Sequence, residues 1–464
     1  MAFDWSDLTV RKALGMRTDL AQEDLAYEGV STDSRTISEG DLYVALVGER
    51  FDGHDFVADA FARGAAGAVV SRPAAGDPAG MFYPVDDTLD ALGRLAAWRR
   101  QRIDVPVVAI TGSSGKTTTK EMTRAALAET YRVHATPGNQ NNRIGMPLTI
   151  LSMPDDVEAL VLELGTNQPG EIEALAQVAR PDIAVITTVG KSHLEKLETF
   201  DGVLAEKLQI LRGMAEGGRC VVGDDPPVLS ERAHAICSTV QVVGWSQNDD
   251  QHVRPENAEV DVFGRYSFEW RGHKVTAPTA GKHAASNALI ALAVASLLNV
   301  PVRDAVRGLG SSEIGSMRGE FQRIGDLTVI VDCYNANPQS VRASLEVLES
   351  QAVTGDKVAV LGSMLELGNA ATELHAEVLK DAVARDVDLV IATGHFAEVA
   401  AELGFSEERV VSGENWEAVY SGLVDRLNGG EIILLKASRG IALERMLTRL
   451  EEDFGREGAR RVGT

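Results

Sequence analysis

The sequence AITGSSGKTTTKE, residues 109–121, follows the apolar run VPVVAI at residues 105–110. A glycine-rich turn that links a strand to a helix is the context of a phosphate-binding loop, because backbone N–H groups and the helix N-terminus converge there. Lys116 would reach the outer phosphates of a nucleotide, and the Thr117 hydroxyl would bind Mg²⁺. The spacing departs from the strict pattern, since Ile110 stands where the first glycine is expected. A glycine turn with a chance lysine does not explain all of these features together.

Apolar runs of strand length follow the loop along the chain. Residues 159–165, 183–189 and 219–225 are rich in aliphatic and β-branched side chains. Such runs are typical of strands that are buried on both faces of a parallel sheet. The sequence therefore predicts a central parallel sheet that carries the phosphate loop at the end of one strand.

The alternation of strands and helices divides the 464 residues into three α/β regions. Residues 1–86 form a small unit, with strand-like pieces at 29–35 and 41–48 and a helix followed by a strand within 56–71. Residues 87–312 begin with a helix at 88–102 and contain the phosphate loop and a buried helix at 286–298. Residues 313–464 repeat the alternation, with strands expected at 327–334, 357–364, 389–394 and 431–438. The polar tail at 451–464 is expected to fray.

The charge balance limits the classes of partner. Lys and Arg total 45 and Asp and Glu total 68, so the formal charge is −23. This disfavours nucleic acid and anionic membranes as partners; solubility is the simpler explanation of the acidity, and adaptation to high salt stays open. Three scattered cysteines and an N-terminus without an apolar run indicate a cytoplasmic protein without a membrane span, which we expect to be a monomer.

An acidic chain that binds nucleotides needs local cations. Five basic residues lie beside turns rich in Gly, Ser or Asn and could hold anions: Arg35, Arg143, Arg318, Lys436 and Arg439. Taken singly, each is more often a solvated surface charge.

Two polar residues follow predicted strands of the central sheet. Glu163 lies at the end of the run ALVLELG, and His193 lies in the turn after IAVITTV. A single Glu or His is usually structural. Ligands of open α/β sheets bind at the carboxyl ends of the strands, however, and both residues fall on the same edge as Lys116. We therefore expect Glu163 and His193 to hold a divalent cation, and the carboxylate suits Mg²⁺ best.

Lys207 lies in a predicted helix at residues 200–214. At helical spacing it shares a face with three leucines, Leu204, Leu208 and Leu211. A lysine on an apolar face must snorkel, pair or be modified, and spacing alone favours snorkelling.

Five motifs together resemble the Mur ligases: ITGSSGKTTTKE, TPGNQNNRIGMPLT (136–149), ELGTNQPGEI (163–172), DCYNANPQSVRASL (332–345) and LGSMLELG (361–368). The likeness extends from STDSR at 31–35 to KASRG at 436–440. The resemblance implies an N-terminal UDP-substrate domain, a central ATPase domain and a Rossmann-like C-terminal domain. Within the family, the chain looks most like the ligases that join D-alanyl-D-alanine to a UDP-linked muramoyl tripeptide through an acyl phosphate.

The resemblance also assigns roles to single residues. ATP would contact the phosphate loop, Gly112, Ser113, Ser114, Gly115, Lys116, Thr117 and Thr118. Further nucleotide contacts would come from Asn287, Arg318, Asp332, Tyr334, Asn335 and Asn337. Thr117, Glu163 and His193 would bind Mg²⁺, and Lys207 would be carbamylated by CO₂ and help to hold the second Mg²⁺. The UDP moiety would contact Ser31, Asp33, Ser34 and Arg35, with Asn139 and Asn142 near the muramoyl peptide.

The chain departs from the family pattern at three places. Lys191-Ser192 replaces Pro-Ala before the histidine, Ser363 replaces Asp, and Ala437 replaces Gly. Closure of the C-terminal domain over ATP is expected about a hinge at residues 311–316. Three other functions stay open: an amide ligase of the same superfamily with another amine acceptor, a phosphate-loop NTPase without ligase activity, and a non-catalytic nucleotide-binding homologue.

Overall fold

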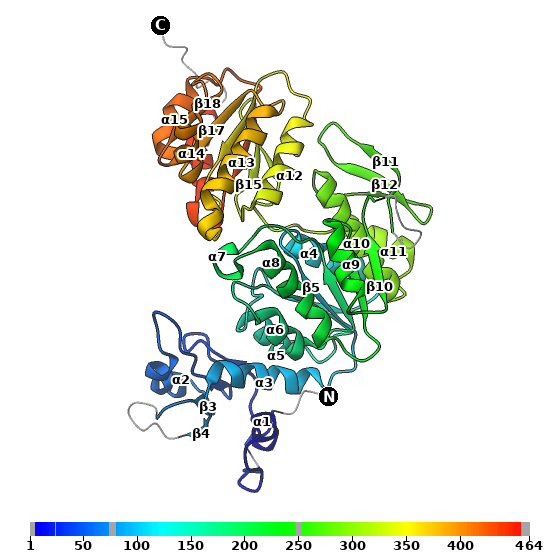
Figure 1. The fold of residues 1–464 in the computed structure, drawn as a ribbon. Helices are drawn as coiled ribbons and strands as arrows, with labels where there is room; N and C mark the ends of the chain where they lie inside the picture. Colours follow the sequence, from blue (N-terminus) through cyan, green and yellow to red (C-terminus); the bar gives the residue numbers. More distant parts are fainter. Residues whose placement is uncertain (1–4, 24, 74–79, 247–252, 456–464) are drawn as a thin grey trace.

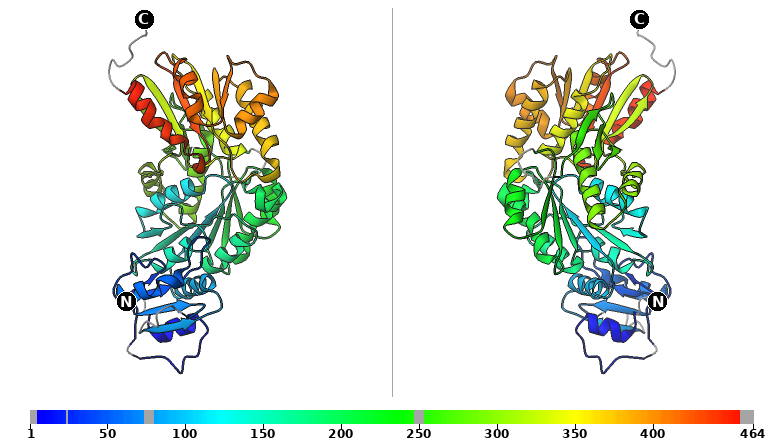
Figure 2. Two further views of the ribbon diagram at one scale, coloured as in Figure 1. Left: turned by 90° about the vertical axis from the view of Figure 1, so that its left-hand side faces the viewer. Right: turned by 90° about the vertical axis from the view of Figure 1, so that its right-hand side faces the viewer.

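The computed structural model describes residues 5–23, 25–73, 80–246 and 253–455. Three α/β units follow one another along an elongated molecule, from blue at one end, through cyan and green, to yellow and red at the other (Figure 1). Views from two further sides also place the first and last units at opposite ends (Figure 2). The predicted α/β fold with three domains is confirmed, while the boundaries at residues 86 and 312 stay predictions.

The N-terminal unit is built on a small parallel sheet in the order β1-β2-β3-β4. Its strands are β1 (Val30–Ser31), β2 (Leu42–Val44), β3 (Gly67–Val70) and β4 (Met81–Pro84), and its helices are α1 (Asp7–Ala13), η1 (Gly53–Phe56) and α2 (Val57–Ala62). The strand predicted at 29–35 is wrong beyond Ser31. The Asp33 carboxylate accepts a hydrogen bond from the Arg35 backbone N–H at 2.9 Å, which turns the chain there.

Helix α3 (Thr88–Arg100) joins this unit to the central one. The Asp87 side chain caps its first turn by accepting from the Asp90 N–H at 2.9 Å. At its other end, Arg99 donates to the Leu151 carbonyl and Arg100 donates to the Ala179 carbonyl. These contacts anchor α3 on the central unit.

The central sheet is parallel throughout, in the order β10-β9-β8-β5-β7-β6. The four predicted strands are present, and β6 and β10 extend the sheet at its two edges. The strands are β5 (Val107–Thr111), β6 (Val133–Ala135), β7 (Ala159–Glu163), β8 (Ile183–Ile186), β9 (Arg219–Gly223) and β10 (Val240–Val243). The helices between them are α4 (Lys116–Ala128), α5 (Gly145–Leu151), α6 (Glu171–Ala179), α7 (Leu194–Leu197), α8 (Phe200–Leu208), η2 (Gln209–Gly213) and α9 (Pro227–His234).

Helix α10 (Lys282–Leu297) is the buried helix predicted at 286–298, and it begins four residues earlier. It packs against α4 and is followed by α11 (Val302–Gly310). An antiparallel sheet in the order β11-β12-β13 precedes it, and the sequence reading missed this sheet. Its strands are β11 (Glu256–Val260), β12 (Tyr266–Trp270) and β13 (His273–Thr276). Every residue of β11 is exposed, so no apolar alternation marks it in the sequence.

The C-terminal sheet has the order β14-β15-β19-β16-β17-β18 and is parallel except for β14. Its strands are β14 (Glu320–Ile324), β15 (Leu327–Asp332), β16 (Lys357–Leu361), β17 (Leu389–Thr393), β18 (Val410–Gly413) and β19 (Ile432–Lys436). Four of them were predicted. The helices are α12 (Pro338–Glu349), η3 (Gly368–Ala370), α13 (Ala371–Ala384), α14 (His395–Leu403), α15 (Trp416–Val424), η4 (Arg439–Ile441), η5 (Leu443–Arg445) and α16 (Met446–Phe454). The tail predicted to fray at 451–464 is helical to Phe454, and residues 456–464 lie outside the described part.

Two further observations concern membrane-spanning helices and cysteines. Among the described residues, no helix combines the length and apolar character that crossing a membrane needs. Cys220, Cys237 and Cys333 are buried and free.

Candidate active site

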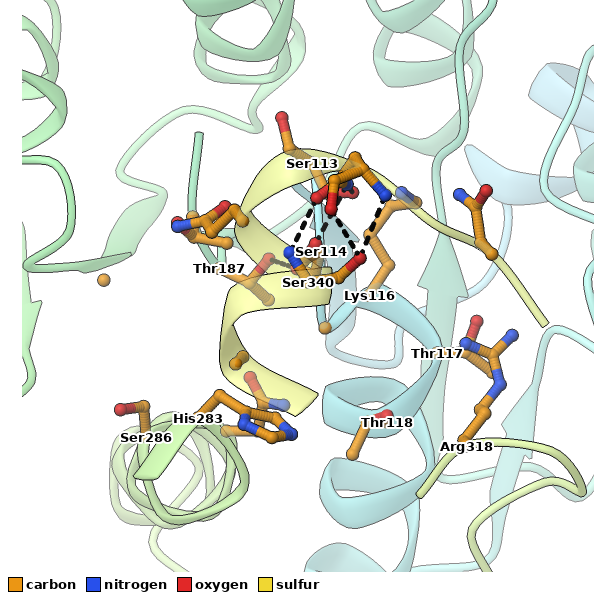
Figure 3. A pocket seen from close by; sticks show the side chains of 18 of the residues that line it. Ser113, Ser114, Lys116, Thr117, Thr118, Thr187, His283, Ser286, Arg318 and Ser340 are labelled. Atoms are coloured by element: carbon orange, nitrogen blue, oxygen red, sulfur yellow. Dashed lines mark hydrogen bonds between the residues drawn. The ribbon is translucent and has the colours of Figure 1, made fainter. Parts of the chain in front are cut away.

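A cavity of about 1090 Å³ lies between the central and C-terminal units. Its central wall is the phosphate loop with the carboxyl ends of β7 and β8, and its C-terminal wall is the segment around α12. Figure 3 shows Ser113 and Ser114 of the phosphate loop beside Ser340 of α12. The predicted site residues on its wall are Ser113, Ser114, Gly115, Lys116, Thr117, Thr118, Asn139, Asn142, Glu163, His193, Asn287, Arg318, Asp332, Tyr334, Asn335 and Asn337. The tertiary structure thus brings together residues from across the second and third units.

The phosphate loop has the form that its glycines allow. Gly112 passes so close to Thr187 that a Cβ atom there would lie 2.0 Å from the Thr187 hydroxyl oxygen. Gly115 has a φ of 80° and starts α4, in a conformation that side chains disfavour. The Lys116 ammonium donates to the Gly112 carbonyl at 2.8 Å, across the loop. A helix leaves the N–H groups of its first turn without intrahelical partners, so the start of α4 and the lysine together suit a phosphate group.

Lys116 is surrounded by charged groups. Burial lowers the pKa of its ammonium, the nearby Glu163 carboxylate opposes this, and Arg318 adds to it. Arg318 follows the predicted hinge at 311–316 and belongs to the C-terminal unit, so positive charge reaches this part of the cavity from both walls.

Glu163 is the last residue of β7 and is 1% exposed. One carboxylate oxygen, Oε1, accepts from the Asn141 side-chain amide at 2.7 Å. The other, Oε2, is buried and has no hydrogen-bond partner among the described residues. A buried carboxylate oxygen without a partner is unfavourable unless a ligand such as a cation completes it. Sequence reasoning found Glu163 but missed Asn141, although the run NQNN around it was visible.

His193 links the central unit to the C-terminal one. Its Nδ1 lies 2.6 Å from Glu366 Oε2. Burial lowers the pKa of His193, and the adjacent His193 side chain lowers the pKa of the Glu366 carboxyl group. Both residues have positive φ, 54° and 64°, so each sits at a constrained turn. Glu366 belongs to the LGSMLELG motif, but nothing in the sequence showed that it would face His193.

Lys207 is completely buried, and its Nζ has no hydrogen-bond partner among the described residues. The snorkelling favoured by spacing is therefore wrong, because the amine does not reach water. Burial lowers the pKa of Lys207 well below the ordinary amine value, and the nearby Lys116 charge adds to this. Lys207 lies close to the phosphate loop but is not on the cavity wall. The lowered pKa favours the neutral amine, which is the form that can act as a nucleophile.

Helix α12 starts beside the phosphate loop (Figure 3). Asn337 forms a capping box with Ser340 and also donates from its amide to the Ser114 hydroxyl at 3.2 Å. Gln339 donates to the Thr188 hydroxyl at 2.8 Å and to the Asp225 carboxylate at 2.9 Å. The N-terminal ends of α4 and α12 thus face the same space, and both favour an anion there.

The loop after β15 carries the remaining nucleotide candidates. The Arg318 guanidinium lies 3.7 Å from the centre of the Tyr334 ring. Asp332 accepts from the Lys436 ammonium at 2.7 Å and from the Ser344 hydroxyl at 2.6 Å. Lys436 is only 2% exposed, so it is a buried ion-pair partner and not a solvated surface charge.

Several predicted residues lie elsewhere. Ser31, Asp33, Ser34 and Arg35 belong to the N-terminal unit and are not on the cavity wall. Asp33 and Arg35 form an exposed ion pair at 2.6 Å, and the Arg35 guanidinium lowers the pKa of Asp33 to about 2. Gly112 lies behind the cavity wall, at the base of the loop.

Two of the three departures from the family pattern form local hydrogen bonds, and the third is buried. The Ser192 hydroxyl donates to the Ser113 hydroxyl at 3.0 Å and so ties the His193 turn to the phosphate loop. The Ser363 hydroxyl accepts from the His395 N–H at 2.9 Å. Ala437 is fully buried.

Three family models match the chain in order. They are the Mur ligase family catalytic domain at residues 26–100, the Mur ligase middle domain at 110–295 and the Mur ligase glutamate ligase domain at 317–439. UDP-N-acetylmuramoyl-tripeptide–D-alanyl-D-alanine ligase of Bacillus subtilis is 37% identical, over 93% of this chain and 94% of that protein. The enzyme of the same name from Escherichia coli is 31% identical, over 94% of this chain and 96% of that protein.

Solved structures give the same result. MurF from Acinetobacter baumannii superposes with a TM-score of 0.88 at 31% identity, over 97% of this chain and 99% of that one. MurF from Thermotoga maritima in complex with ADP superposes with a TM-score of 0.82 at 30% identity, over 93% of this chain and 99% of that one.

Proposed function

The chain belongs to the Mur ligase family, and from that premise we propose that it joins D-alanyl-D-alanine to UDP-N-acetylmuramoyl-tripeptide. ATP is converted to ADP and phosphate, and the product is the UDP-muramoyl-pentapeptide precursor of peptidoglycan. The observation that carries this proposal is the convergence of Lys116, Glu163 and His193 at one edge of the central sheet, opposite the first turn of α12. The chain is thus an ATP-dependent ligase that forms a C–N bond.

The reaction has two steps. The terminal carboxylate of the tripeptide attacks the γ-phosphorus of ATP, which gives an acyl phosphate and ADP. The amine of D-alanyl-D-alanine then attacks the acyl carbon, loses a proton and displaces phosphate. Lys116 and Arg318 would neutralise the transferring phosphoryl group, since positioning and charge neutralisation supply most of the catalysis in such transfers. The first turn of α12 would cover the phosphates and help to exclude water from the acyl phosphate.

The residues at this edge fit a magnesium ion. The buried Oε2 atom of Glu163 has no partner among the described residues, and the Thr117 hydroxyl and His193 lie on the same cavity wall. Within the described ranges, no three His, Cys, Asp and Glu side chains form a metal site on their own. Thr117 and the phosphate oxygens of ATP would therefore complete the ligand set. Bound Mg²⁺ supplies positive charge to the phosphates.

Lys207 fits the carbamylation that the family resemblance implies. Its buried amine has no partner among the described residues, and burial lowers its pKa well below the ordinary amine value, which favours the neutral form. The amine nitrogen would attack the carbon of CO₂ and release a proton, leaving an anionic carbamate. That anion would face Lys116 and help to hold a second Mg²⁺.

The remaining assignments extend this proposal. The UDP moiety would bind the N-terminal domain at Ser31, Asp33, Ser34 and Arg35, with the muramoyl peptide near Asn139 and Asn142. Residues 1–86, 87–312 and 313–464 would be the three domains, with closure about residues 311–316. A monomer in the cytoplasm is the form in which we expect the enzyme to work.

Phosphate release with ATP, Mg²⁺ and UDP-muramoyl-tripeptide, with and without D-alanyl-D-alanine, tests the proposal. We expect release that depends on the dipeptide, with UDP-muramoyl-pentapeptide identified by mass. Release that depends on the UDP substrate alone would indicate another amine acceptor. Release that depends on neither would refute the ligase and favour an NTPase.

A further inference from the structure

Helix α4 carries a second buried lysine, one turn after Lys116. The Lys120 side chain is fully buried. Its ammonium donates to the Thr136 carbonyl at 2.7 Å and to the Gly138 carbonyl at 3.2 Å. Its Nζ also lies 2.6 Å from the Glu121 carboxylate. Lys116 faces the cavity, whereas Lys120 faces the loop that follows β6.

That loop, residues 136–142, holds Glu163 from two sides. At its start, the Thr136 hydroxyl accepts from the Glu163 backbone N–H at 2.9 Å. At its end, the Asn141 amide donates to Glu163 Oε1 at 2.7 Å, and the Asn141 carbonyl accepts from the Gly165 N–H at 2.8 Å. The loop therefore fixes both the backbone and one carboxylate oxygen of Glu163, and it leaves Oε2 without a partner among the described residues.

Little packs around Gly138, in the middle of this loop. A Cβ atom built on Gly138 would have no neighbour within 4 Å, and the residue has a φ of 52°. The Lys120 ammonium is thus the group that ties this turn to α4. A buried carbonyl that loses a charged donor is destabilised by roughly 1–3 kcal/mol, which is enough to favour another loop conformation.

We propose that Lys120 is a positioning residue for the divalent-cation site. Its ammonium donates to the Thr136 and Gly138 carbonyls and so fixes the conformation of the loop. In that conformation the Asn141 amide hydrogen-bonds to Glu163 Oε1, and Oε2 is available to bind the cation. This inference rests on the proposed magnesium-dependent reaction. It connects helix α4 to the proposed cation ligand Glu163 through the contacts of Lys120, of the loop at 136–142 and of Asn141.

The test is the affinity for Mn²⁺ in the presence of a non-hydrolysable ATP analogue, measured by electron paramagnetic resonance. It shows whether Lys120 and Asn141 position Glu163 for the cation, and it needs no peptide substrate. Lys120→Met keeps the length of the side chain and removes the charge and the donors. We expect Mn²⁺ to bind roughly 10- to 100-fold more weakly, as happens when residues that orient a metal ligand are lost. Asn141→Ala should weaken Mn²⁺ binding in the same range while leaving Lys120 and its carbonyl contacts intact.

Lys357→Met is the matched control. Lys357 is also largely buried and donates to a backbone carbonyl, that of Glu349 at 2.6 Å, but it belongs to the C-terminal unit. It should lower the melting temperature and leave Mn²⁺ affinity unchanged.

Wild-type Mn²⁺ affinity in folded Lys120→Met, or in Asn141→Ala, would overturn the proposal and leave Lys120 with a purely structural role. Should Lys120→Met fail to fold, Asn141→Ala decides by the same criterion. Because Mn²⁺ binding needs no dipeptide, failure of this inference is separate from failure of the ligase assignment.

Discussion

Lys207 of the central unit and Lys436 of the C-terminal unit are both almost completely buried, but their surroundings are opposite. Lys436 is 2% exposed and donates to Asp332 at 2.7 Å and to the Asn335 carbonyl at 2.9 Å. Lys207 is 0% exposed and has no partner among the described residues. A paired buried lysine stabilises a scaffold only if its pair stays complete, whereas an unpaired one lowers stability. Lys436 thus holds the loop that carries Tyr334, whereas Lys207 is the lysine for which we propose a chemical role.

The largest expected effect is that of Lys207→Met on the ligase reaction. Loss of the amine, and of the carbamate proposed on it, should lower dipeptide-dependent phosphate release by roughly 10²–10³-fold, the range for removing one electrostatic contact to a transition state. The melting temperature should stay equal or rise, because an unpaired buried amine is removed. Both are measured on purified protein, the first by phosphate release and the second by calorimetry.

A strongly destabilised but active Lys207→Met protein would contradict this account of Lys207. If a short-chain carboxylic acid, which can replace the carbamate, restores activity to the variant, the result would support the carbamate proposed on Lys207.

For Lys436→Met we expect the main effect on the stability of the fold and not on the ligase reaction. The substitution leaves the partly buried Asp332, whose side chain is 20% exposed, without its cation. Breaking a fully buried pair from one side costs about 3–5 kcal/mol of unfolding free energy, and we expect a loss toward the lower end of that range. Denaturant unfolding of the variant measures this loss. The double variant Lys436→Met with Asp332→Asn should recover part of it, since no unpaired charge remains. Equal stability of the two variants would mean that the pair does not act as a unit.

The smallest expected effect is the loss of stability at acid pH that comes from His375 in the C-terminal unit. His375 is buried and its Nε2 accepts from the Met364 N–H at 2.9 Å, which requires the unprotonated ring. Burial lowers its pKa from 6.5 to about 4. Because the unfolded chain binds the proton first, the stability that His375 contributes is complete above pH 6.5 and is lost as pH falls toward 4. Between pH 7 and 5 the loss should be about 2 kcal/mol.

Unfolding free energies of the wild type and His375→Gln, compared across that pH range, measure this contribution. The variant should be less stable at pH 7 and should lose less stability on acidification. Parallel curves for the two proteins would contradict the assignment.

Much of the fold followed from local patterns. The central strands were predicted because aliphatic runs of that length are buried on both faces of a parallel sheet. Strand β11 was missed because all its residues are exposed, and β14 because its pattern is mixed, with one of its five residues buried. Glu163 and His193 were found because parallel strands present their carboxyl ends at one edge.

The sequence by itself determined which side chains lie at the sheet edge and which helix face is apolar. Only the tertiary structure decided their partners: Asn141 for Glu163, Glu366 for His193, two loop carbonyls for Lys120, and none among the described residues for Lys207. The physical reason is that periodicity reports the burial of a residue along its own element. Hydrogen bonds and ion pairs depend on groups from other elements, which come within reach only when the domains pack.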